Sequence, residues 1–115
     1  MRAHVQAAAA AIAIAHSSGR RVSGVAGPHG AVNVEVTVRD GRVEGYDYTN
    51  GCHIDGNLPN LYHYGQSAHL ELKPKEGGKY DGYDYGASCH FEVQVRGRNA
   101  DVYSYGGGGW SSYSA

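Results

Sequence analysis

The stretch GYDYTNGCH, residues 45–53, returns as GYDYGASCH at residues 82–90, in the same nine-residue frame. Similarity that recurs at a fixed distance indicates a structural unit used more than once. Shorter echoes of the Tyr-x-Tyr element follow at residues 62–64 and 103–105. The repeat therefore decides the fold, and the residues around it indicate what the unit is.

The residues before the first copy alternate in polarity as a half-buried strand does. Four valines occupy every second position of residues 32–38, with polar residues between them. Asp40-Gly41 then supplies a two-residue hairpin turn, and the Tyr-x-Tyr segment returns after it. Each unit is thus predicted to be a strand, a turn, a Tyr-x-Tyr strand and a Gly-bearing turn into the next unit.

The chain is predicted to form a single α+β domain. We expect a helix over 2–18, β-hairpin repeats over 21–105 that form about eight or nine short antiparallel strands in a meander, and a Gly-rich C-terminal segment over 106–115. The predicted sheet is strongly curved and holds the helix in its concave face, against the strand glycines Gly45 and Gly82. The main alternative is a closed up-and-down barrel without a central helix.

The N-terminal segment is rich in alanine, and Ser17-Ser18-Gly19 is a helix stop signal. This favours a buried helix. The alternative is a signal peptide over 1–15 that ends at Ala13-Ile14-Ala15, which would make the protein secreted. The apolar run is too short for a transmembrane segment.

Composition narrows the choice of partners. The 115 residues carry a formal net charge of −1, with 10 Lys and Arg against 11 Asp and Glu. Nothing in this balance favours a phosphate backbone, so nucleic acid is not expected as a partner. The chain also holds 10 tyrosines but one Phe and one Trp, so its aromatic surface is mostly phenolic.

Strand parity assigns the two faces of the sheet. The core face is predicted to carry mainly aliphatic residues: Val34, Val36, Val43, Ile54, Leu61, Leu70, Leu72, Tyr80, Phe91, Val93, Val95, Ala100 and Val102. The opposite face is predicted to carry the tyrosine pairs, three repeat histidines and carboxylates. Its proposed ligand- or partner-binding residues are Tyr46, Tyr48, Tyr62, Tyr64, Tyr83, Tyr85, Tyr103, Tyr105, His53, His69 and His90.

This Tyr/His face is the strongest functional candidate in the sequence. A large bare aromatic patch is rare on a soluble monomer, and Tyr is common at interfaces. We expect a non-catalytic β-repeat module that self-associates or binds another partner through this face. Self-association would give a homo-oligomer, formed through this face or through open sheet edges. The alternatives are a carbohydrate or small-ligand binding protein and a small hydrolase-like enzyme. A covering layer over the tyrosines would remove the argument.

Cys52 and Cys89 take equivalent places in the two copies. In an open meander their turns lie about four strands, or roughly 19 Å, apart, whereas a disulfide needs Cα atoms within about 7 Å. Free thiols are therefore expected, unless the sheet rolls far enough to bring them together or a bridge joins two protomers. Free thiols favour a reducing, cytoplasmic location.

Catalytic and metal sites find less support. Adjacent residues of a strand face opposite sides, so Cys52-His53 and Cys89-His90 cannot readily chelate within each pair. His53, His69 and His90 lie two strands apart, roughly 10 Å, which is too far for one metal. Asp47, His63 and Ser104 are triad residue types, but no nucleophile elbow surrounds the serine. We predict no catalytic residues, metal site or cofactor, and interpret Asp47, His63, Asp84 and Ser104 as strand-end polar groups satisfied by turn amides.

Overall fold

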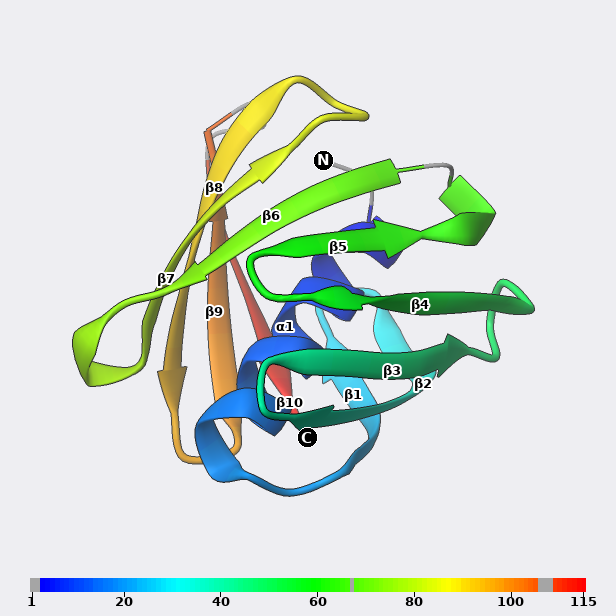
Figure 1. Ribbon diagram of the computed structural model, residues 1–115, viewed down its shortest axis with the longest axis horizontal. Helices are drawn as coiled ribbons and strands as arrows, with labels where there is room; N and C mark the ends of the chain where they lie inside the picture. The colour runs from blue at the N-terminus through cyan, green and yellow to red at the C-terminus, as the bar shows by residue number, and fades with distance from the viewer. Residues whose placement is uncertain (1–2, 67, 106–108) are drawn as a thin grey trace.

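Ten antiparallel strands close around one helix in the computed structural model, which describes residues 3–66, 68–105 and 109–115 (Figure 1). The elements are α1 (Ala3–Ser18), β1 (Val22–Gly27), β2 (Gly30–Arg39), β3 (Arg42–Asp47), β4 (Cys52–Asn57), β5 (Asn60–His63), η1 (Tyr64–Gln66), β6 (Ala68–Pro74), η2 (Glu76–Gly78), β7 (Lys79–Asp84), β8 (Cys89–Arg96), β9 (Asn99–Ser104) and β10 (Gly109–Ser114). The predicted helix with an antiparallel meander is confirmed, and the helix lies inside the barrel.

Every strand pairs with the strand that follows it, as expected for hairpin repeats. The β2–β3 turn is the predicted Asp40-Gly41, in which both residues have positive φ, 50° and 78°. That geometry matches the twist of the two strands, and Arg39 pairs with Arg42 across it. Local turn chemistry therefore fixes the register of the first copy.

The sheet closes where β1 meets β10, with Ala26 opposite Ser114. Closure corrects one expectation. The open edges predicted for a meander are absent at the first and last strands, because these two strands pair with each other. The segment predicted as Gly-rich over 106–115 contains β10, while residues 106–108 lie outside the described part of the chain.

The helix occupies the barrel interior because its side chains are small on all sides. Every residue from Ala7 to Ala15 is buried. The helix packs against β1, β2, β8 and β9 (Figure 1). It ends as predicted: Gly19 has a left-handed φ of 69°, and its amide donates to the Ala15 carbonyl at 3.0 Å.

The two strand glycines leave room for barrel side chains, not for the helix as predicted. A Cβ on Gly82 would overlap the ring of Phe91, its cross-strand partner. A Cβ on Gly45 would lie 2.8 Å from the Glu35 carbonyl oxygen and 3.1 Å from Val36. Glycine is needed here because the wall itself is closely packed on its inner side.

The predicted face assignment is confirmed. All thirteen residues assigned to the core face are buried and belong to one hydrophobic cluster with the helix. Tyr113 of β10 joins this cluster and donates to Gln6 Oε1 at 3.0 Å, which ties the last strand to the helix.

No helix in the described part of the chain has the length and apolar character needed to cross a membrane.

Candidate functional site

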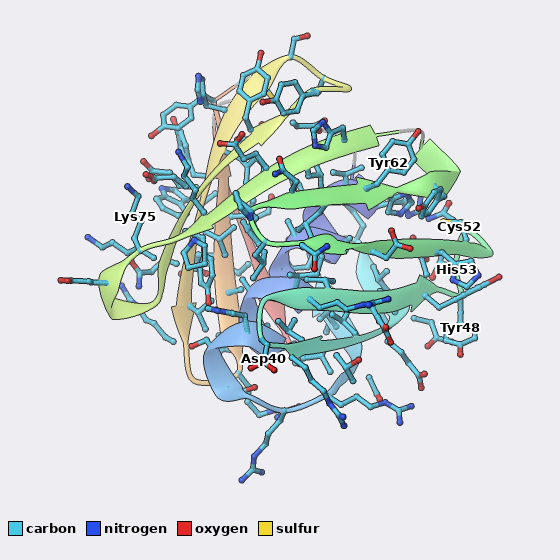
Figure 2. All side chains as sticks on the ribbon, in the orientation of Figure 1. Asp40, Tyr48, Cys52, His53, Tyr62 and Lys75 are labelled. Atoms are coloured by element: carbon cyan, nitrogen blue, oxygen red, sulfur yellow. The ribbon has the colours of Figure 1, made fainter. Side chains whose placement is uncertain are left out.

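The tyrosine pairs lie on the outside of the barrel, where the sequence placed them. The second member of each pair is 49 to 54% exposed, and the first is half-buried. The two rings of each pair touch, with centroids 4.7 to 4.9 Å apart. Figure 2 shows Tyr48, His53 and Tyr62 on the side of the barrel where β3 and β5 end. No second layer covers this face in the described part of the chain.

Three of the four inner tyrosines contact an aromatic or imidazole ring on the next strand. Tyr46 contacts His53 and Tyr83 contacts His90 edge to face, with centroids 4.9 and 4.7 Å apart. Tyr103 contacts Trp110 in the same place, at 5.1 Å. In β5 and β6, Tyr62 is paired with His69, whose ring stacks on Tyr85. The Tyr/His face thus repeats one cross-strand arrangement around the wall.

Each outer tyrosine donates its hydroxyl to a carboxylate on the preceding strand. The four bonds are Tyr48 to Glu35 at 3.4 Å, Tyr64 to Asp55 at 3.0 Å, Tyr85 to Glu71 at 3.3 Å and Tyr105 to Glu92 at 2.7 Å. These bonds hold the exposed rings in fixed orientations against the wall.

Three of these carboxylates also raise the pKa values of the tyrosine hydroxyls that they bind. Hydrogen bonds to Asp55 and Glu92 raise the pKa of Tyr64 and of Tyr105, and the charge of Glu71 raises the pKa of Tyr85. The hydroxyls of Tyr64, Tyr85 and Tyr105 therefore stay protonated at neutral pH and remain hydrogen-bond donors.

The two copies of the repeat each form a shallow groove on this face, of about 390 Å³. The first groove lies over Gly45 and is lined by Glu35, Glu44, Tyr46 and His53. The second lies over Gly82 and is lined by the equivalent residues Glu71, Asp81, Tyr83 and His90. Duplication of the hairpin has therefore duplicated a surface hollow of the same chemistry.

Charges around the grooves are mixed. Arg21 borders the first groove and pairs with Glu35 at 2.6 Å. Lys73 and Lys75 border the second. A larger hollow of about 520 Å³ continues from the first groove over β3 and β4, past Asp55. Neither groove presents one sign of charge, which suits a neutral ligand rich in hydrogen-bonding groups.

A second cluster faces inward at the same end of β3, β4 and β5. His63 Nε2 and Asp47 Oδ2 are 3.0 Å apart, with both side chains essentially buried, at 0 and 1% exposure. Cys52 Sγ lies 3.9 Å from each ring nitrogen of His63. These three residues are the Asp-Cys-His cluster. They form a group of three potential metal ligands in which the ligand atoms lie within 4.8 Å of one another.

The cluster is held by its neighbours. Asn50 donates to Asp47 twice, from its backbone amide at 3.1 Å and from Nδ2 at 2.7 Å. Burial by itself would raise the pKa of Asp47, but the hydrogen bonds from Asn50 and His63 outweigh it and hold this pKa below its usual value. Burial raises the pKa of Cys52, and the Asp47 charge adds to the effect.

The second copy lacks the imidazole. Its equivalent residues are Asp84, Cys89 and, in the matching Tyr-x-Tyr triplet, Ser104. Cys89 Sγ lies 4.0 Å from Ser104 Oγ, and Asp84 accepts from the amides of Gly86 and Ala87. The two copies thus share an aspartate and a cysteine, and they differ in the third residue.

Several predictions for these residues are confirmed, but one cluster of side chains was not predicted. Both cysteines are free, and Asp47 and Asp84 bind turn amides, as predicted. Ser104 lies four strands along the sheet from His63, so the triad types do not assemble. What sequence reasoning missed is Cys52 beside Asp47 and His63. A signal existed, because Asp47 pairs with Cys52 across one hairpin turn and His63 follows on the next strand.

Comparison with models of known protein families, with curated proteins and with solved structures found no match.

Proposed function

We propose that this chain is a non-catalytic binding module whose Tyr/His face recognises polyhydroxylated ligands, oligosaccharides in particular. The observation that carries the proposal is the groove that occurs twice, each time lined by at least two carboxylates, a tyrosine and a histidine. Tyrosine offers an apolar ring face together with a polar edge, which suits the two sides of a sugar ring. Carboxylate and imidazole groups provide partners for hydroxyls.

The fixed orientation of the outer tyrosines supports this proposal. Each outer ring is tied to a carboxylate and packed on its inner neighbour. Little side-chain entropy is therefore lost when a ligand binds, so more of the contact energy contributes to affinity.

The test is a glycan-array screen followed by calorimetric titration of the best oligosaccharide. The variant Tyr46→Ala/Tyr83→Ala removes one ring from each groove and is expected to weaken binding roughly 10-fold, because each stacked aromatic contributes about 0.5–1.5 kcal/mol. The control is Arg96→Ala, at the exposed end of β8 away from both grooves, which should bind as the wild type does. Absence of any glycan binding, or equal loss in both variants, would contradict the proposal.

A second candidate is self-association through the same face, which is favoured by the 59% exposure of Trp110 next to Tyr103. Light scattering over a hundredfold range of concentration, with and without reductant, tests it. A mass that grows with concentration in both conditions supports a homo-oligomer, and Trp110→Ser should then shift it toward the monomer. A constant monomer mass excludes this candidate.

A further inference from the structure

From the geometry of the Asp-Cys-His cluster we infer that Asp47, Cys52 and His63 form a binding site for one divalent transition-metal ion of the zinc class, with a fourth position open to water. This inference concerns the inward side of β3–β5 and does not rest on the proposed function of the outer face.

The donor set fits such an ion. Zinc takes thiolate, imidazole and carboxylate ligands, commonly with three protein ligands and one water where the site is open. Asp47, Cys52 and His63 supply one ligand of each kind from three adjacent strands, which are rigid supports. Cys52 is half-buried while the other two are fully buried, so the cluster has one side nearer to solvent.

Two of the three ligand-to-ligand distances also fit, and the third lies within the 4.8 Å that encloses the three ligand atoms. Tetrahedral coordination with ordinary zinc bond lengths puts nitrogen and oxygen about 3.3 Å apart and sulfur and nitrogen about 3.6 Å apart. The corresponding distances here are 3.0 Å for His63 Nε2 to Asp47 Oδ2 and 3.9 Å for Cys52 Sγ to His63 Nε2. Shifts of a few tenths of an ångström bring both to the coordinated values.

The position of the Cys52 sulfur argues against the alternative in which Cys52 is a nucleophile and His63 is its base. Cys52 Sγ is equally far from both ring nitrogens, so the thiol does not lie on the lone-pair axis of either. Gly65 permits this approach, because a Cβ there would come 2.5 Å from Sγ. Proton transfer needs a directed S–H to nitrogen contact, whereas a metal ion lies between its ligands and needs no direct contact between sulfur and nitrogen.

The support around the ligands is that of a metal site. Metal-bound carboxylates are usually hydrogen-bonded in turn, and loss of such partners lowers metal affinity 10- to 100-fold. Asn50 supplies two bonds of this kind to Asp47. On binding, the Cys52 thiol releases its proton to solvent, and the carboxylate and thiolate neutralise the 2+ charge of the ion.

The experiment uses the full chain, reduced and treated with chelator, titrated with Co²⁺ as a spectroscopic substitute for zinc. We expect one equivalent to bind, with thiolate-to-cobalt charge-transfer absorption and the intense visible bands of a tetrahedral ion, both abolished by excess Zn²⁺. Cys52→Ser should lose the charge-transfer band and weaken Co²⁺ binding at least about 100-fold, and Asn50→Ala should weaken it about 10- to 100-fold.

The matched control is Cys89→Ser, because Cys89 has the same place in the copy that lacks the imidazole. It should bind Co²⁺ as the wild type does. A charge-transfer band that survives in Cys52→Ser, a band lost in Cys89→Ser, or no band at a hundredfold excess of Co²⁺ would each overturn the inference.

A second measurement needs no variant and holds even if Cys52→Ser does not fold. Alkylation of the native wild-type chain, followed by mass spectrometry, gives a rate for each cysteine. Zn²⁺ should slow alkylation of Cys52 at least about 10-fold and leave the rate of Cys89 unchanged. Equal effects on both cysteines, or none on Cys52, would contradict a site at this cluster.

Discussion

At the residue scale, Tyr80 joins the helix to the barrel wall. It is buried in the core, as is Tyr113, and its hydroxyl lies 2.7 Å from His16 Nδ1 and donates to the Ala13 carbonyl at 3.2 Å. Burial raises the pKa of Tyr80 to about 12. The phenol therefore contributes to stability only while it keeps its proton.

This predicts a loss of stability at high pH that depends on one residue. In the unfolded chain Tyr80 loses its proton near pH 10, and in the folded chain near 12, so its contribution is complete below pH 10 and is lost as the pH rises toward 12. Urea unfolding across this window should show a steeper fall in the free energy of unfolding for wild type than for Tyr80→Phe. Near neutral pH the variant should be less stable by about 1 kcal/mol. Parallel pH profiles would contradict this account.

Cross-strand rows show how the two copies differ on the inner side of the wall. Gly45, Ile54 and His63 form one row, and Gly82, Phe91 and Ser104 form the equivalent row. The residue with a ring is the third one, His63, in the first row and the second one, Phe91, in the other row. Volume is thus exchanged between neighbours within each row, which is the kind of change a packed core tolerates.

The exchange predicts a gain-of-site variant. Phe91→Ile/Ser104→His places an imidazole next to Cys89 and removes the ring that would clash with it. If the Asp-Cys-His cluster binds metal, this variant should bind two equivalents of Co²⁺ where the wild type binds one, by titration of the charge-transfer absorption. Ser104→His alone is the control, and it should be destabilised by about 1–3 kcal/mol because the row is overfilled.

At the element scale, the helix is defined by size more than by amphipathicity. It is apolar all round because the barrel surrounds it, and alanine dominates because the wall leaves little space between backbones. An open sheet could move away from a larger side chain, but a closed wall cannot.

Enlarging one helix residue should therefore be costly on any side. Ala10→Leu keeps helix propensity nearly unchanged but adds volume at a fully buried position, and should lower the free energy of unfolding by about 1–3 kcal/mol. Ala3→Leu, at the exposed start of the same helix, should change it by less than about 0.5 kcal/mol. Urea denaturation followed by circular dichroism compares the two. A helix in a loose interior would tolerate both changes equally.

At the scale of the whole molecule, closure between β1 and β10 decides which surfaces are available to partners. Closed barrels lack the unpaired edge strands that drive sheet-to-sheet association. Contacts with other molecules are consequently left to the outer face, where the tyrosines and the two grooves lie.

Opening the barrel should restore unpaired strand edges and allow the chains to associate through them. Removal of residues 109–115 deletes β10 and exposes the edges of β1 and β9 together with part of the core. We expect this truncated chain to associate in a concentration-dependent manner in light scattering, at concentrations where Ser112→Ala, which keeps β10 and loses one hydroxyl, behaves as the full chain does. Equal masses for both would show that β10 is not needed for closure.

The local features of this protein follow from its amino-acid sequence alone. The period of two fixed which residues of each strand face inward, as Val34, Leu72 and Val102 show, and Asp40-Gly41 fixed a turn. It also placed all four tyrosine pairs on the outer face. These features depend on residues close together in the chain, so pattern and turn chemistry suffice to predict them.

Closure of the barrel and the meeting of Asp47, Cys52 and His63 depend on the tertiary structure. The pairing of β1 with β10 joins the two ends of the sheet, and this pairing depends on the accumulated twist and register of all ten strands. The three side chains meet because two successive registers bring the ends of β3, β4 and β5 to one level. Hydrophobic period says which face a residue occupies, but not which residues of that face share a height, because height is set by the pairing of whole strands.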